Sequence, residues 1–238
     1  MTARPLVSVV IPAYQAEHTL GDQLDALARQ RLEAPWEVLV CDNGSTDGTA
    51  TVAAAHADRL PALRVIDASA ERGPSAARNA GAAAARGVLL AFCDADDAVA
   101  DGWLAAITRA LEDAAIVTGT SRRRELNAPA DAPPSFEWSR YVAPFFPQLP
   151  GAGAGNLGIR ADVFAELTGF DTRLRTGEDV DLCWRAQLAG HHLGHAADAY
   201  VTVSNRSGLR ATFRQHFAYG AGNRLLIQKH AHVIEAFA

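Results

Sequence analysis

The feature that most constrains the fold is an alternation, over the first hundred residues, between continuous apolar runs and segments with helical spacing. The apolar runs, which we interpret as strands, occupy residues 6–11, 36–41, 63–66 and 88–93. The helical segments between them occupy residues 19–31, 49–60 and 75–86. Strands without polar alternation are buried on both faces, and intervening helices allow successive strands to run parallel. The pattern therefore predicts an α/β fold with a mainly parallel central sheet and helices on both faces.

The second half of the chain is less regular. We expect helices at residues 101–113, 161–168 and 178–189, and strands at 115–119 and 200–203. Residues 127–150 hold six prolines and no clear period, which predicts a loop or flap. Residues 206–229 form a basic amphipathic stretch. We expect that stretch to pack on the core with a solvated basic face, and peripheral membrane contact stays open.

The composition argues against several classes of protein. The formal charge is −5, from 22 basic and 27 acidic side chains, which does not suit a general nucleic-acid binder. No apolar stretch approaches the roughly 20 residues that span a bilayer, so we expect no transmembrane segment and a cytoplasmic location. Cys41, Cys93 and Cys183 form no C-x-x-C pair. They are predicted to be buried thiols in a reducing compartment.

Polar residues gather where the predicted parallel strands end. The strands at 6–11, 36–41, 63–66 and 88–93 are followed by Pro12-Ala13-Tyr14, Asp42-Asn43-Gly44, Asp67 and Asp94-Ala95-Asp96-Asp97. Three of these four ends carry carboxylates. In open α/β sheets, ligands bind outside the carboxyl ends of the strands, so this clustering is the first indication of a functional site.

The acidic turn at 94–97 is the strongest local feature. Three carboxylates within four residues repel one another unless a cation is present. Mg²⁺ commonly uses one or two carboxylates together with substrate phosphates. Asp96, helped by Asp94, is therefore a candidate to hold a divalent metal (Mg²⁺ or Mn²⁺) on a diphosphate. The alternative is an acidic turn that caps the helix at 101–113.

Two further segments carry candidate binding residues. In Asp42-Asn43-Gly44-Ser45, we assign Asp42 to binding a nucleobase or ribose, and we expect residues 44–47 to form a turn and helix cap. Arg78 lies early in a helix, where a cation is unfavourable to the helix dipole. Its position is explained if the guanidinium reaches an anionic ligand, although a surface arginine is an equal alternative.

The last candidate segment is 177–185, with the sequence GEDVDLCWR. Glu178 and Asp179 lie in a loop-to-helix turn, where a general base can face a substrate. Acids in a first helical turn also suit the helix dipole, so a simple capping role remains the alternative.

Five motifs occur in an order that resembles family 2 glycosyltransferases, over about residues 5–205. They are VSVVIPAY at 7–14, CDNGSTDGT at 41–49, GPSAARNAG at 73–81, FCDADD at 92–97 and GEDVDLCWR at 177–185. The resemblance implies one domain of the GT-A type, whose Rossmann-like residues 1–98 bind a nucleotide sugar and whose residues 99–238 bind the acceptor. It implies an inverting transfer from a nucleoside-diphosphate sugar, with a uridine diphosphate sugar as the expected donor.

The resemblance also implies roles for individual residues. Pro12, Ala13 and Tyr14 would line the nucleoside pocket, with Asp42 and its neighbour Asn43 at the base or ribose. Arg78 would lie at the base region or diphosphate, and Asp94 near the ribose and donor sugar. Asp96 would ligate the metal. Asp179 would be the general base, and Glu178 would support the acceptor.

The chain departs from the family pattern at two places. Many relatives have a second aspartate where this chain has Asn43, and an amide donates as well as accepts, so another base remains possible. Many metal-dependent relatives have a histidine ligand after the strand at 200–203, where this chain has Ser204-Asn205-Arg206. The metal site is therefore expected to have fewer protein ligands, or to stay open until substrate binds.

Other functions fit the residues less well. A sugar nucleotidyltransferase usually needs a glycine- and lysine- or arginine-rich loop after the first strand, and residues 14–18 lack one. A Rossmann dehydrogenase is disfavoured because no G-x-G-x-x-G follows that strand. A catalytically silent nucleotide-sugar-binding module keeps the pocket without the chemistry. The acceptor is left open between a glycan, a lipid-linked glycan and a small molecule.

Overall fold

The computed structural model describes residues 4–123, 136–203 and 222–236. Its strands are β1 (Val7–Ala13), β2 (Trp36–Asp42), β3 (Arg64–Asp67), β4 (Leu89–Cys93), β5 (Ala98–Val99), β6 (Ile116–Arg123), β7 (Phe136–Trp138), β8 (Tyr141–Ala143), β9 (Phe146–Gly151), β10 (Asn156–Arg160) and β11 (Leu193–Val203). Its helices are α1 (Leu20–Ala28), α2 (Thr49–Ala55), the short 3₁₀ helix η1 (Ala57–Arg59), α3 (Pro74–Ala84), α4 (Trp103–Asp113), α5 (Ala161–Glu166), α6 (Glu178–Leu188) and α8 (Ala231–Ala236). Residues 222–229 are also helical.

One nine-stranded sheet runs through the described chain, in the order β3-β2-β1-β4-β10-β6-β11-β5, with β7 paired to β6. The strands β1 to β4 run parallel to one another, and β10 lies antiparallel between β4 and β6. Because β10 is antiparallel to both of its neighbours, β6 runs in the same direction as β1 to β4, and β11 runs parallel to β6. The expected mainly parallel sheet is confirmed, and its carboxyl edge gathers turns from both halves of the chain.

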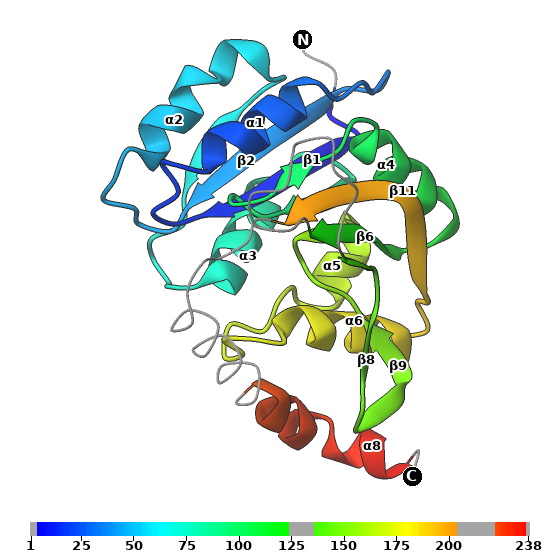
Figure 1. The fold of residues 1–238 in the computed structure, drawn as a ribbon. Helices are drawn as coiled ribbons and strands as arrows, with labels where there is room; N and C mark the ends of the chain where they lie inside the picture. Colours follow the sequence, from blue (N-terminus) through cyan, green and yellow to red (C-terminus); the bar gives the residue numbers. More distant parts are fainter. Residues whose placement is uncertain (1–3, 124–135, 204–221, 237–238) are drawn as a thin grey trace.

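Helices cover both faces of this sheet, as the apolar strands predicted (Figure 1). Val9 and Ile11 of β1 pack with α1, α2 and α4, whereas Val10 packs with α3, α5 and α6. Each of these three strand residues is fully buried. Burial of both faces explains why β1 contains an unbroken apolar run.

Three sequence expectations about the elements were wrong. We placed residues 127–150 in a loop, but 136–151 contain β7, β8 and β9, while 127–135 lie outside the described residues. The central strand β10 was missed, because a short run after a glycine-rich loop carries little strand signal. The helix expected at 75–86 ends two residues earlier, at Ala84. A Cβ at Gly87 would lie 2.7 Å from the Ser8 amide nitrogen, so close approach to β1 requires glycine there.

The carboxy-terminal segment packs against the end of the molecule opposite α2 (Figure 1). Leu226 is buried in a small apolar cluster with Trp184 and Val180 of α6 and with Phe146 of β9. This placement fits the expected packing on the core for residues 222–229, and the rest of the basic stretch lies outside the described residues. Among the described helices, none has the length and apolar character needed to cross a membrane.

Candidate functional site

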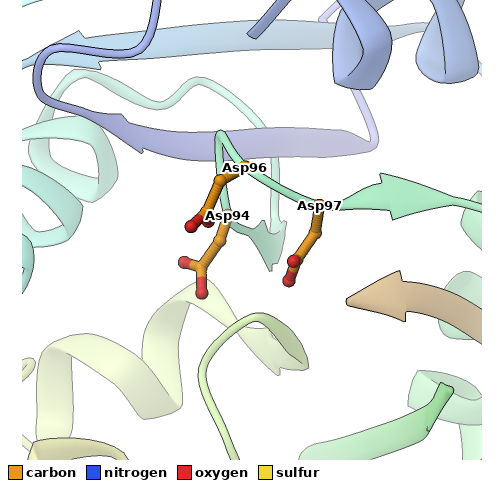
Figure 2. A group of neighbouring side chains, drawn as sticks. All are labelled: Asp94, Asp96 and Asp97. Atoms are coloured by element: carbon orange, nitrogen blue, oxygen red, sulfur yellow. The ribbon is translucent and has the colours of Figure 1, made fainter. Parts of the chain in front are cut away.

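The turn after β4 brings three carboxylates together. One oxygen from each of Asp94, Asp96 and Asp97 lies within 4.8 Å of the others, and Figure 2 shows the three side chains on the same side of the turn. Asp97 is nearly buried, and the other two are half-buried. We predicted Asp94 and Asp96 as metal ligands and did not assign Asp97, although its carboxylate was visible in the same motif.

These side chains fit a hard divalent cation. Mg²⁺ and Mn²⁺ sites favour carboxylate oxygens, and three carboxylates this close repel one another unless positive charge lies nearby. Asp94 already receives such charge from Arg78 at one oxygen, and its second oxygen lies on the side of Gly155. The donor set is therefore chemically suited to a metal that also contacts phosphate oxygens.

Arg78 connects this turn to α6. Its guanidinium donates to Asp94 at 2.6 Å and to Glu178 at 3.1 Å, and it lies over the ring of Phe170. Burial would lower the pKa of Arg78, but the charges of Asp94 and Glu178 raise it, so the side chain stays protonated. We predicted that Arg78 reaches an anionic ligand or lies at the surface. The surface alternative is wrong, because Arg78 is buried on carboxylates of the protein. Its contact with a ligand stays a prediction.

The glycine-rich loop between β9 and β10 lies between the acidic turn and the start of α6. The Ala154 N–H donates to the Asp179 carboxylate at 3.2 Å. A Cβ at Gly153 would lie 3.9 Å from the same carboxylate, and one at Gly155 would lie 2.7 Å from that of Asp94. The loop backbone therefore approaches both acids closely.

The pKa values of the two acids at the start of α6 are both raised. Burial and the neighbouring charge of Asp179 raise the pKa of Glu178, against the opposing charge of Arg78. Burial also raises the pKa of Asp179, although the Val180 amide and Arg78 work against it. Asp179 keeps partial solvent exposure. A raised pKa brings a carboxylate closer to the value that suits a general base near neutral pH.

At the end of β2, Asp42 and Asn43 play different parts. Asp42 is half-buried, and its carboxylate accepts from the Ser45 amide at 2.9 Å. Asn43 is nearly buried and donates to the carbonyls of Ala68 and Glu71, while its oxygen accepts from the Gly73 amide. An aspartate could not donate these two bonds, which gives a physical reason for asparagine here. The predicted contacts of both residues with a nucleotide stay predictions.

The turn after β1 is locked to the turn after β2. The Gln15 amide donates to Ser45, and the Gln15 side chain accepts from the Thr46 amide. The Ala16 amide donates to Thr49 in the same way. These contacts agree with the expected turn at 44–47. The residue that caps α2 is Gly48, without a side-chain cap, although the Asp47 carboxylate accepts from the Thr49 amide at 3.1 Å. Beside them, Tyr14 is 59% exposed with Arg72 over its ring, while Pro12 and Ala13 are mostly covered.

Other expected features lie apart from this cluster or outside the described residues. The position of the missing family histidine, residues 204–206, lies outside the described residues. The three cysteines are free and buried, as expected.

Comparisons with known proteins agree with this arrangement. The chain matches the family model of glycosyl transferase family 2 over residues 8–168. It is 31% identical over 199 residues to Glycosyltransferase AglE of Haloferax volcanii, in an alignment that covers 82% of this chain and 65% of that protein.

Two solved structures share the fold. S. aureus TarS 1-349 in complex with UDP-GlcNAc has a TM-score of 0.66 at 21% identity, covering 85% of this chain and 59% of that one. Mannosyltransferase PcManGT from Pyrobaculum calidifontis, in complex with GDP-Man and Mn²⁺, has a TM-score of 0.68 at 20% identity, covering 90% and 61%. The chain thus spans less than two thirds of each of these proteins. Its fold is of the GT-A type, and the family match includes Asp42, Arg78 and the acidic cluster, so this chain belongs to glycosyl transferase family 2.

Proposed function

We propose that this chain transfers a sugar from a nucleoside-diphosphate sugar to an acceptor, with inversion at the anomeric carbon. The observation that carries the proposal is the convergence of chain-distant acids. Arg78 contacts both Asp94 and Glu178, and the loop at 153–155 approaches both Asp94 and Asp179. A candidate metal ligand and a candidate base therefore flank one backbone segment at the carboxyl edge of the sheet, where ligands bind in α/β folds.

Residues 1–98 would bind the donor nucleotide and residues 99–238 the acceptor. Tyr14 offers an exposed ring for stacking, with Pro12 and Ala13 beside it, and the second carboxylate oxygen of Asp42 would accept from a base or ribose. Asn43 would position the neighbouring loop through its three backbone contacts. TarS is described with UDP-GlcNAc and PcManGT with GDP-Man, so these comparisons leave the base open between uridine and guanosine.

Asp94, Asp96 and Asp97 would hold a divalent metal, Mg²⁺ or Mn²⁺. A metal bound there neutralises negative charge on the leaving diphosphate, which is the chemistry such ions supply in phosphate sites. Support comes from the carboxylate geometry and from PcManGT, whose structure contains Mn²⁺ with its donor. Arg78 would hold Asp94 in place and balance the charge of the cluster.

Asp179 would act as the general base. Its carboxylate would accept the proton of the acceptor nucleophile as that oxygen forms a bond to the anomeric carbon. The bond from this carbon to the diphosphate oxygen breaks in the same displacement, which inverts the configuration. Glu178, held by Arg78, would support the acceptor side. The Ala154 N–H fixes one oxygen of Asp179, so the carboxylate is oriented before substrate arrives.

The test is transfer from radiolabelled UDP- and GDP-sugars to a panel of glycan, lipid-linked and small-molecule acceptors, with the wild type and Asp179→Asn. We expect the variant to lose about 10²- to 10⁴-fold in kcat, because the proton acceptor is removed, while donor affinity survives. Full transfer by Asp179→Asn would refute the base assignment. Donor binding by the wild type without transfer or hydrolysis for any pair would favour a silent binding module.

A further inference from the structure

Two buried glutamines on α1 and just beyond it have no role in the proposed chemistry. Gln23 is fully buried and Gln30 is 4% exposed, although both lie among core leucines. Gln23 lies within α1 and Gln30 follows its end, and the side chains of both reach the backbone of residues 94–104. A buried amide costs free energy unless its donor and acceptor are both satisfied.

Gln23 satisfies both groups on the acidic turn. Its Nε2 donates to the Asp94 carbonyl at 3.0 Å, and its Oε1 accepts from the Val99 amide at 3.0 Å. These two backbone groups stand at the start and at the end of the segment that carries Asp96 and Asp97. One rigid amide therefore joins both ends of the acidic turn to α1.

Gln30 makes the same kind of contact one segment further along the chain. Its Oε1 accepts from the Leu104 amide at 3.1 Å, and its Nε2 donates to the Ala100 carbonyl at 2.9 Å. That segment leads into α4 and carries none of the three carboxylates. The two glutamines thus have similar burial and chemistry but hold different pieces of backbone.

We propose that Gln23 is a positioning residue for the metal–diphosphate site, a role that rests on the function proposed above. Carboxylates of like charge tend to separate, and a turn whose ends are not held can open to let them do so. The Gln23 amide fixes the distance between the Asp94 carbonyl and the Val99 N–H, and with it the spacing of the acids between them. Partners that orient metal ligands in this way affect metal affinity without touching the ion.

The experiment compares Gln23→Met with Gln30→Met, two substitutions that keep side-chain length and remove the amide's hydrogen bonds to the neighbouring segment. Gln30→Met also removes a bond within its own segment, from Nε2 to the Ala26 carbonyl at 3.2 Å. Binding of Mn²⁺ alone, and of Mn²⁺ with UDP or GDP, is measured by calorimetry, and thermal unfolding is followed without metal. We expect both variants to lose a similar amount of thermal stability. We expect only Gln23→Met to bind Mn²⁺ roughly tenfold more weakly, with KM for the donor raised more than kcat is lowered.

Equal Mn²⁺ affinity in the two folded variants overturns the positioning role of Gln23, while metal-dependent transfer by the wild type leaves the proposed function standing. If the wild type binds no Mn²⁺ with or without nucleotide, the metal part of the proposed function fails, and the inference fails with it.

A measurement on the wild type keeps the inference testable if Gln23→Met does not fold. Hydrogen exchange of the Val99 amide, which donates to Gln23, should slow when Mg²⁺ and a nucleoside diphosphate bind. Exchange of the Leu104 amide, which donates to Gln30, should not change. Unchanged exchange at Val99 in a protein that binds the ligand overturns the proposal.

Discussion

At the scale of single residues, a buried cation, Arg78, accounts for how the acids of the candidate site are brought together. Arg78 is 5% exposed and satisfies two carboxylates from elements that are far apart in the sequence. The sequence showed only that a cation stood at an unfavourable place in a helix. Its partners could not be predicted, because the contacts with Asp94 and Glu178 depend on how α3, β4 and α6 pack.

Replacement of Arg78 with Met should destabilise the protein by about 3–5 kcal/mol, because two acids lose the cation that compensates them. Urea unfolding at pH 7 would measure the loss. Arg109→Met is a suitable control, since Arg109 and its partner Asp198 are both exposed, and such pairs contribute little. A loss at position 78 no larger than that at position 109 would show that the buried pairs do not stabilise the fold.

At the scale of elements, the loop between β9 and β10 decides how closely the two groups of acids approach. Gly155 faces the Asp94 carboxylate, whereas Gly153 leaves room for a methyl group beside Asp179. Neither glycine has a positive φ, so the space and not the backbone conformation distinguishes them.

Gly155→Ala should therefore displace the Asp94 carboxylate, and Gly153→Ala should not. We expect about tenfold weaker binding of Mn²⁺ with a nucleoside diphosphate in Gly155→Ala, of the order seen when the support of a metal ligand is lost. Calorimetric titration of both variants would check this. Equal affinities would mean that the Asp94 carboxylate yields to the methyl group at no cost to the site.

The start of α6 is also held by the carboxy-terminal segment. Asp181 is fully buried, accepts from His230 at 2.8 Å and pairs with Lys229 and Arg185. Burial would raise the pKa of Asp181, but the bond from His230 and the charges of Arg185 and Lys229 lower it. Asp181, two residues after Asp179, thus ties the acidic helix to the end of the chain.

The sign of the resulting pH dependence follows from the lowered pKa. The stability that Asp181 contributes is fully present above its unfolded pKa of about 3.9 and is lost as the pH falls through the lower folded value. Asp181→Asn should cost about 3 kcal/mol at pH 7, and its difference from the wild type should shrink below about pH 4. Urea unfolding across this range, with exposed Asp198→Asn as the control, would test it. A difference that does not depend on pH would contradict the assignment.

At the scale of the whole molecule, ligand binding should appear as added stability. A nucleoside diphosphate with Mn²⁺ at a hundred times its dissociation constant should add about 2.7 kcal/mol, which corresponds to several degrees in Tm. Thermal unfolding with UDP and GDP, with and without Mn²⁺, would measure the shift. The metal-dependent part should disappear in Asp96→Asn and persist in Asp101→Asn, whose side chain is exposed. A shift that does not depend on Mn²⁺ would argue against a metal in the donor site.

Much of the parallel half of the sheet could be predicted from local sequence. The strands β1, β2 and β4 are recognisable in the sequence as apolar runs. The polar residues that follow them lie at one edge of the sheet, as parallel strands require. The strand β10 could not be predicted, because Asn156–Arg160 gains its place only from pairing with β4 and β6 on either side. The strands β7 to β9 could not be predicted either, because they lie in a proline-rich segment and form by pairing with β6 or with each other.

The candidate site divides in the same way. The sequence by itself determined which acids stand at strand ends and helix starts, since those positions depend on local periodicity and turn residues. Only the tertiary structure decided that Arg78 pairs with Asp94 and Glu178, and that Gln23 bonds to both ends of the acidic turn. The physical reason is that hydrogen bonds and ion pairs between distant segments depend on how helices and strands pack. No local sequence pattern specifies which distant side chains that packing brings together.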